Sequence, residues 1–275
     1  MEDRIKIDIT GGVADVRMVR VDKMNALDDP MFEALVSTID KLKADKSVRV
    51  VVLSGEGRAF CAGLDAGNFG KMASGEGRYS EAGGKKSAED AAFASRTHGP
   101  ANRAQYAVWG WRDLPVPVIA AVHGFAFGGG FQLTLGADMR YVTPDAKLSI
   151  MEIKWGLVPD MAGTQLMRHI VREDIVRELT YTGRIFSGEE AGKFGFATRV
   201  VADPREEALA VAREIAGKNP DAIRAVKRIY NAAVYDDAKT GLMAESVEQI
   251  KLIGSKNQVE AVMANMQKRD PVFQD

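Results

Sequence analysis

Cysteine, histidine and net charge are all scarce in this sequence of 275 residues. The single cysteine, Cys61, excludes an intramolecular disulfide and a metal site built from several cysteines. It fits a reducing compartment, so we expect a cytoplasmic protein. The 37 basic residues are matched by 38 acidic ones, which leaves a formal net charge of −1. Because a polyanionic partner requires a basic surplus, nucleic acid is not expected as the main ligand.

Membrane-spanning runs are lacking as well. The stretch from Leu114 to Ala137 carries no formal charge, but Pro115, Pro117 and its glycines would leave helix hydrogen bonds broken in lipid. A buried strand, a turn and the start of a helix explain this stretch better. The N-terminal residues are charged and lead into an alternating strand rather than an apolar signal core. We therefore expect no membrane segment.

Several common catalytic motifs are also missing from the sequence. Gly128-Gly129-Gly130 lacks the third glycine of a dinucleotide fingerprint, and no Lys-Ser or Lys-Thr follows it as a phosphate-binding loop needs. No serine stands in a G-x-S-x-G elbow. The three histidines lie in unrelated contexts without zinc-ligand spacing, so we predict no metal site.

Strand and helix patterns alternate over residues 1–202. Apolar and polar residues alternate on either side of Gly11-Gly12, which predicts a β-hairpin over 5–10 and 13–18. Asp28-Asp29-Pro30 predicts the start of a helix. We expect an α/β core here, and short apolar runs predict its buried strands at 48–53, 116–122, 139–143 and 148–151.

Two further regions differ from this core. Residues 203–275 form a predicted C-terminal helical region, with helical patterns over 206–216, 221–234, 242–253 and 258–268. Residues 66–99 are rich in glycine, and only 88–94 has a helical pattern. Long excursions of this kind tend to cover binding sites, although a tolerated insertion is the alternative.

Two segments, 50–65 and 118–132, each run from a strand through a glycine turn into a helix. Glycine lets the backbone approach a ligand closely, and the first N–H groups of a helix have no intrahelical partner. Two such N–H groups aimed at one oxygen would form an oxyanion hole. The alternative for either segment is a tight corner between strand and helix. Cys61, in the first segment, fits a small buried thiol.

The motifs along the chain resemble those of the crotonase (enoyl-CoA hydratase/isomerase) superfamily, over essentially the whole sequence. The resemblance is carried by Arg20-x4-Asn25-Ala26-Leu27, Ala59-Phe60-Cys61-Ala62-Gly63-Leu64-Asp65, His123-Gly124-x3-Gly128-Gly129-Gly130 and Gly156-Leu157-x-Pro159-x3-Gly163-Thr164. It implies a spiral of ββα units, with C-terminal helices that help to form a homotrimer or a hexamer. It also implies an acyl-CoA thioester substrate, with coenzyme A entering as part of the substrate and no resident cofactor.

Carried onto this chain, the resemblance assigns the thioester oxygen to the backbone N–H groups of Leu64 and Gly129. The segments 62–67 and 23–26 would line the path of coenzyme A. The substrate-binding residues implied in this way are Lys23, Asn25, Ala26, Ala62, Gly63, Asp65, Gly128 and Gln132.

The acids depart from the hydratase pattern of that family, in which one glutamate follows the glycine triplet and a second lies further along. The first position here is Gln132, which cannot act as a general base, whereas Glu152 matches the second. Asp160 is similar in position to an aspartate of the family's dienoyl-CoA isomerases, although those enzymes also carry an acid at the position of Gln132. We therefore predict Glu152 and Asp160 as catalytic acids and favour double-bond isomerisation over hydration.

Two alternatives stay open for the function. A water molecule held by Glu152 and Gln132 could still add to the double bond, which would make the protein an enoyl-CoA hydratase. An oxyanion hole without a working base would still bind thioesters, which would make it a catalytically weak acyl-CoA-binding protein.

Overall fold

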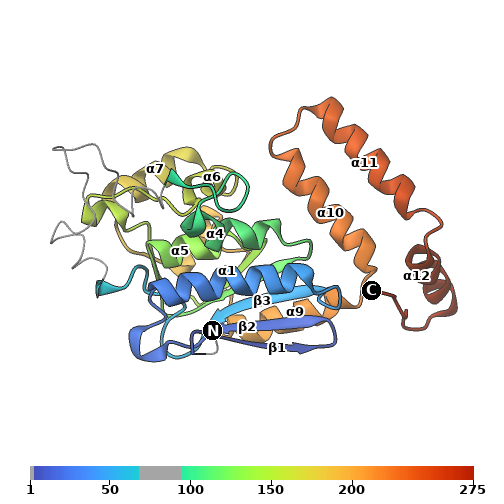
Figure 1. Ribbon diagram of the computed structural model, residues 1–275, viewed down its shortest axis with the longest axis horizontal. Coiled ribbons are helices and arrows are strands. Elements are labelled where there is room, and N and C mark those ends of the chain that lie inside the picture. The colour runs from blue at the N-terminus through green and yellow to red at the C-terminus, as the bar shows by residue number, and fades with distance from the viewer. Residues whose placement is uncertain (1–2, 68–93) are drawn as a thin grey trace.

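The computed structural model describes residues 3–67 and 94–275 (Figure 1). The predicted excursion at 66–99 and the helical pattern at 88–94 lie almost entirely outside the described residues. Strands and helices alternate through the described part of the chain, so the predicted α/β class is confirmed. None of the described helices is long and apolar enough to span a membrane.

A six-stranded sheet lies at the centre, in the order β1-β2-β3-β4-β6-β9. Its strands are β1 (Ile5–Thr10), β2 (Val13–Met18), β3 (Val50–Gly55), β4 (Val118–Val122), β6 (Met139–Val142) and β9 (Arg199–Val200). β1 and β2 pair antiparallel, and the later neighbours pair parallel. The predicted hairpin is confirmed: Gly11 and Gly12 have φ values of 57° and 81°, which suit a two-residue turn between strands.

Helices cover both faces of this sheet, and strand β3 shows the consequence. Val51 and Leu53 point into the larger core, beneath α1 (Asp29–Ala44) and α4 (Arg103–Asp113). Val50 and Val52 point the other way, into a smaller core covered by α9 (Pro204–Ala216). Successive side chains of a strand alternate between faces, so a strand between two helical layers is apolar throughout. Figure 1 shows α1 crossing the sheet, with α4 and α5 stacked beyond it.

Helix α1 begins where the sequence predicts it. Asp28 Oδ1 accepts a hydrogen bond from Met31 N (2.9 Å), and Pro30 lies in the first turn. Arg4 and Arg20 both reach Asp28 Oδ2, at 2.9 and 3.2 Å. Arg4 precedes β1 and Arg20 follows β2, so the start of the helix is tied to the open end of the first hairpin.

A second sheet of three strands has the order β5-β7-β8, with β5 (Phe125–Phe127), β7 (Lys147–Ser149) and β8 (Phe186–Ser187). β5 leads through Gly128 into α5 (Gly129–Leu135), so the glycine triplet forms the predicted corner between strand and helix. The strand predicted at 148–151 ends at Ser149. The chain turns at Met151 into a short 3-10 helix, η2 (Glu152–Trp155).

The remaining short elements complete the body of the molecule. They are η1 (Val21–Lys23), α6 (Gly163–Met167), α7 (Glu173–Thr182) and α8 (Gly188–Phe194). Helix α9, the first helix of the predicted C-terminal region, packs against β2, β3, β4 and β6 of the central sheet.

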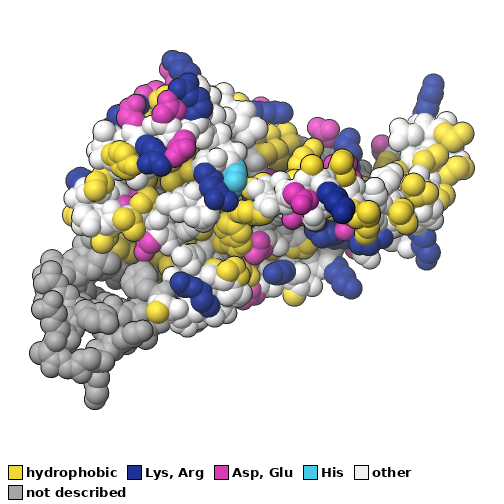
Figure 2. All heavy atoms as spheres, turned by 90° about the horizontal axis from the view of Figure 1, so that it is seen from above, with side chains coloured by type: hydrophobic (Ala, Val, Ile, Leu, Met, Phe, Trp, Pro, Cys, Tyr) yellow, Lys and Arg dark blue, Asp and Glu magenta, His cyan; other side chains and the backbone are white. Residues whose placement is uncertain are grey.

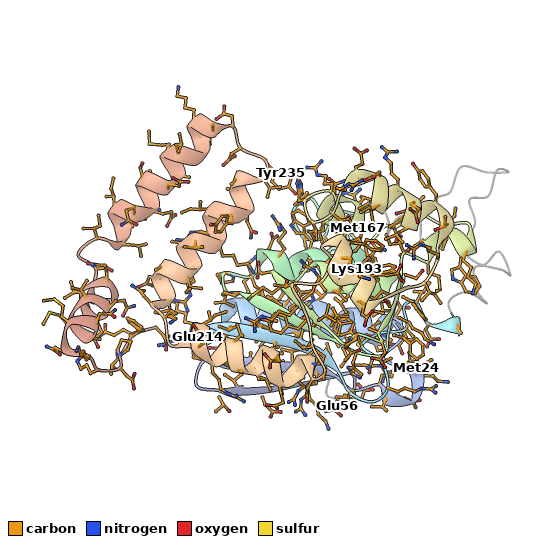
Figure 3. The ribbon with its side chains drawn as sticks, turned by 180° about the vertical axis from the view of Figure 1, so that it is seen from behind. Met24, Glu56, Met167, Lys193, Glu214 and Tyr235 are labelled. Carbon is orange, nitrogen blue, oxygen red and sulfur yellow. The ribbon has the colours of Figure 1, made fainter. Side chains whose placement is uncertain are left out.

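The last three helices extend away from this body (Figure 1). They are α10 (Pro220–Ala233), α11 (Ala238–Leu252) and α12 (Lys256–Gln267). Helix α11 begins earlier than the predicted residue 242, because Asp237 caps it by accepting a hydrogen bond from Thr240 N (2.8 Å). Tyr235, in the turn before α11, stacks edge-on against His169, with ring centroids 5.8 Å apart (Figure 3).

Candidate active site

Two backbone N–H groups lie where the two glycine-rich segments adjoin. Leu27 pairs in parallel with Leu64, because Leu27 N donates to Gly63 O (2.8 Å) and Asp65 N donates to Leu27 O (3.0 Å). In this pattern the N–H of Leu64 points away from Leu27. Gly129 begins α5, and its N lies 3.9 Å from the position of a Cβ on Gly63. Outside the helices and strands of the described residues, no backbone hydrogen bond uses either N–H, and the first N–H of a helix has no intrahelical partner. The predicted donors therefore lie in adjoining segments and are unpaired.

The close packing of these backbones explains the glycines. A Cβ on Gly63, whose φ is 91°, would lie 2.5 Å from Phe127 O, and a Cβ on Gly130 would lie 2.2 Å from Cys61 O. Hydrogen bonds from Cys61 N to Phe125 O (3.0 Å) and from Phe127 N to Cys61 O (3.2 Å) join the segments. Cys61 is fully buried, which raises the pKa of its thiol to about 12, so the predicted buried thiol is confirmed.

An arginine braces the first segment. Arg20 Nη1 donates to Asp65 Oδ2 (2.6 Å) and to Ala26 O (2.9 Å). Asp65 Oδ1 accepts a hydrogen bond from Gly67 N (2.8 Å); this bond, together with Arg20, lowers the pKa of Asp65. Both Asp65 and Ala26 were predicted on the path of coenzyme A. In the structure the Asp65 carboxylate and the Ala26 carbonyl hold the loop and the segment together.

The loop at 23–26 joins the predicted segment at 62–67. Ala62 N donates to Met24 O (3.0 Å). Asn25 is fully buried, and its Nδ2 donates to Glu56 O (3.0 Å) and to a second carbonyl of the same turn. Figure 3 shows Met24 and Glu56 at one end of the core. Lys23 is exposed at the end of η1. The hydrogen bond from Ala62 N to Met24 O joins the two segments. The buried Asn25 side chain fixes the loop at 23–26 to the turn that follows β3.

Both predicted acids lie at this site. Glu152 opens η2 and is only 8% exposed, and this burial raises the pKa of its carboxyl. The charge of Asp160 adds to that rise. Asp160 is exposed, and the desolvation by the protein nearby raises the pKa of its carboxyl. Each acid therefore holds its proton more firmly than a free carboxyl would.

Gln132 connects the segments that carry these acids. It is buried, and its Nε2 donates to Glu152 Oε1 (2.6 Å). Its Oε1 accepts hydrogen bonds from Met161 N (2.9 Å) and Gly163 N (3.0 Å). The sequence predicted Gln132 as a substrate contact or as a residue that holds a water molecule, and gave no sign of these N–H groups. They lie 29 and 31 positions further along the chain, where no local pattern links them to Gln132.

Apolar side chains line the site beside the N–H of Gly129. A Cβ on Gly129 would lie 2.8 Å from Met161 Sδ and 3.0 Å from Leu27 Cδ1, and both of these side chains are buried. Sequence reasoning did not assign either of them to the site. Within residues 3–67 and 94–275, no group of three or more His, Cys, Asp and Glu side chains is arranged to hold a metal ion.

A model described as enoyl-CoA hydratase/isomerase matches residues 8–275. The chain belongs to the enoyl-CoA hydratase/isomerase family. The prediction of the crotonase superfamily is therefore confirmed, and the protein is an enzyme of this family.

Individual relatives of this family member are named for hydration or dehydration. It is 31% identical over 269 residues to the mitochondrial methylglutaconyl-CoA hydratase of Mus musculus, across 95% of this chain and 79% of the relative. It is 32% identical over 278 residues to the carnitinyl-CoA dehydratase of Proteus mirabilis, across 98% of both chains. The crystal structure of an enoyl-CoA hydratase from Bacillus anthracis matches it with a TM-score of 0.85 and 29% identity, across 98% of both chains.

These likenesses confirm the predicted crotonase-like α/β fold with C-terminal helices. They do not bear out the predicted preference for isomerisation, because the relatives carry hydratase and dehydratase names. That preference stays a prediction.

Proposed function

We propose that this family member moves the double bond of an enoyl- or dienoyl-CoA thioester, with Glu152 carrying the proton. The observation that supports this most is the 2.6 Å hydrogen bond from Gln132 Nε2 to Glu152 Oε1. An amide stands at the position where a hydratase of this family would carry a second carboxylate. A single buried carboxyl is enough to remove a proton from one carbon and return it to another.

In this reaction the thioester oxygen accepts hydrogen bonds from the N–H groups of Leu64 and Gly129. Glu152 takes a proton from the carbon next to the thioester carbonyl, and the electron pair of the broken C–H bond moves toward the carbonyl oxygen. Return of the proton to the far carbon of the dienolate completes the shift with no atom gained or lost. Removing one donor from such an oxyanion hole costs on the order of 10²–10³ in rate.

The environment of the acids suits this exchange. A carboxyl that both takes and returns a proton works best when its pKa lies near the working pH. Burial moves the pKa of Glu152 in that direction. Asp160, whose pKa is also raised, is a second carboxyl able to deliver a proton at the far end of the dienolate.

Hydration is the second candidate, and the names of the relatives favour it. It needs a water molecule beside Glu152, activated without help from a second glutamate. The amide of Gln132 could orient such a water but could not take its proton. A catalytically weak acyl-CoA-binding protein remains the third possibility.

A paired assay tests these candidates. The purified protein is offered a trans-2-enoyl-CoA and a cis-3-enoyl-CoA of the same length, and both are followed by absorbance and mass. We expect the 3-enoyl ester to change at constant mass. A gain of one water on the 2-enoyl ester, with no conversion of the 3-enoyl ester, would establish hydration instead. No change in either ester, with retained binding of both, would favour the binding protein.

We propose a homotrimer or hexamer in the cytoplasm, acting without a resident cofactor, a metal, a nucleic-acid partner or a membrane. The apolar side chains that α11 exposes support self-association: Leu242, Met243, Val247 and Ile250 are each at least 42% exposed. Figure 2 shows hydrophobic side chains gathered at the end of the molecule formed by the C-terminal helices.

A further inference from the structure

The carboxamide of Gln132 is held with one orientation. Two backbone N–H groups, from Met161 and Gly163, converge on its oxygen at 2.9 and 3.0 Å. Its nitrogen therefore faces Glu152 Oε1, at 2.6 Å. A flipped amide would direct N–H toward N–H and leave both backbone donors unsatisfied. The side chain of Gln132 thus bridges the carboxyl of Glu152 and the turn that follows Asp160 by hydrogen bonds, in one orientation.

The backbone turn at 161–163 presents two N–H groups that bind the side-chain oxygen of Gln132. Ala162 has a left-handed conformation, with φ of 66°, which aims the N–H groups on either side of it at one point. Backbone N–H groups of one turn arranged in this way form a concave site for an anionic or strongly polar oxygen. A Cβ on Gly163 would lie 2.6 Å from Gln132 Oε1, so only glycine admits this close approach. The left-handed backbone of Ala162 is strained, and the two hydrogen bonds offset that cost.

The two oxygens of Glu152 have different surroundings. Oε1 receives the hydrogen bond from Gln132 and lies 3.5 Å from the position of a Cβ on Gly128. Oε2 is buried and has no hydrogen-bond partner among the described residues. A buried polar atom without a partner is costly unless a ligand or a proton satisfies it.

We propose that Gln132 is a positioning residue, which occupies Oε1 of Glu152 and leaves Oε2 as the atom that exchanges a proton with the substrate. This inference rests on the proposed function. When Oε2 takes a proton, one substrate C–H bond breaks and one O–H bond forms, and the electron pair stays on the substrate as the dienolate. Throughout the exchange Gln132 keeps its proton and its orientation, so the site operates with one movable proton at Glu152.

Replacing the amide by an acid would remove this arrangement. In Gln132→Glu the two N–H groups of the turn would stabilise an ionised Glu side chain at position 132. Two carboxyls this close cannot both ionise, so Glu152 would keep its proton to higher pH. Glu152 would then be a poorer base at neutral pH.

The experiment compares the pH dependence of kcat/KM on the active substrate for the wild type and three variants. Gln132→Glu is the test variant, and Gln165→Glu, on the exposed side of α6, adds the same charge nearby as the matched control. Gln132→Asn keeps an amide that is too short to reach both partners. Thermal unfolding of each variant is measured first.

We expect the acid limb of the Gln132→Glu profile to move up by about one pH unit or more, while Gln165→Glu follows the wild type. Gln132→Asn should lose about tenfold to a hundredfold in kcat with little change in KM. If Gln132→Glu does not fold, the loss in kcat of Gln132→Asn decides the question. Superposed profiles, or an Asn variant with full kcat, would overturn the positioning role. An inactive wild type would instead overturn the proposed function on which this inference rests.

Discussion

Glu152 carries a carboxyl group that the fold makes reluctant to ionise. It is buried, and Gln132 is the side chain that donates a hydrogen bond to it among the described residues. Burial outweighs this hydrogen bond, so the pKa of Glu152 is raised. A protein keeps a half-satisfied acid in its interior at a cost in stability, which is typical of functional sites.

The first prediction at this scale concerns activity. Glu152→Gln should lower kcat by about 10²–10⁴, because it removes the group that moves the proton. Binding of a saturated acyl-CoA, measured by calorimetry, should be retained because the backbone N–H groups remain. Glu189→Gln, on the exposed start of α8, is the matched control and should keep full activity. Equal activity of the two variants would rule out Glu152 as the proton carrier.

The stability of the folded protein should depend on pH through Glu152. Because the folded pKa of Glu152 is raised above its ordinary value of 4.5, the folded protein binds this proton more tightly than the unfolded chain does. The free-energy cost of burying an ionised Glu152 is absent below pH 4.5, where the group is protonated in both states. It is fully present above the raised pKa of the folded state. Glu152→Gln should therefore stabilise the protein at neutral pH and lose that advantage in acid. Urea unfolding of the wild type and the variant at neutral pH and below pH 4.5 measures the free energy of unfolding of each. A stability advantage of the variant that grows on acidification would contradict the prediction.

At the scale of elements, α10 is attached to the body by an unusual anchor. Lys227 is buried, and its Nζ donates to Val116 O (2.8 Å), Asp138 Oδ2 (2.9 Å) and Trp111 O (3.2 Å). Asp138 Oδ2 also accepts a hydrogen bond from Val118 N (2.7 Å), at the start of β4. Burial lowers the pKa of Lys227, but the amine is satisfied by acceptors from the body of the molecule.

The third prediction follows from this anchor. Lys227→Ala should destabilise the protein by about 3 kcal/mol, because it leaves the partners of a buried charge unpaired. Arg228→Ala, its neighbour on α10, breaks an ion pair with Glu248 at 2.6 Å in which the arginine is exposed. That variant should cost less than about 1 kcal/mol. Denaturant unfolding of both variants measures the difference, and similar losses would show that Lys227 is not an anchor.

At the scale of the whole molecule, α10 to α12 leave the body and expose apolar side chains. Helix α11 buries none of its residues. Its apolar side chains are therefore accessible, and Leu242 and Ile250 are 63% and 73% exposed. A helix that shows apolar side chains and buries none within its own chain is suited to an interface. This supports the proposed assembly of several copies.

The fourth prediction tests that assembly. The double variant Leu242→Asp and Ile250→Asp should reduce the mass measured by light scattering to that of a smaller species, because charges do not fit an apolar interface. Gln249→Asp, on the exposed surface of the same helix, adds one charge without removing an apolar group and should leave the mass unchanged. A wild type that is already monomeric would refute the proposed trimer or hexamer.

Local patterns predicted much of the fold. The hairpin follows from the alternation of apolar and polar residues around Gly11-Gly12, and the start of α1 follows from an aspartate cap and a proline. The apolar run of β3 predicted burial on both faces. Each of these features depends on residues within a few positions of one another, so the sequence determines them directly. The order of the glycine-rich motifs was enough to indicate the family that the comparison then showed.

The surroundings of the two acids, in contrast, depend on contacts between distant parts of the chain. Sequence reasoning placed Glu152 and Gln132 at the site but could not show that the Gln132 amide binds Glu152 and the turn at 161–163 together. The anchor of Lys227 spans 89 positions to Asp138 and has no sequence signal either. Spacing along the chain specifies which residues share an element. Burial, amide orientation and pKa depend on what packs around a group, and that comes from distant parts of the chain.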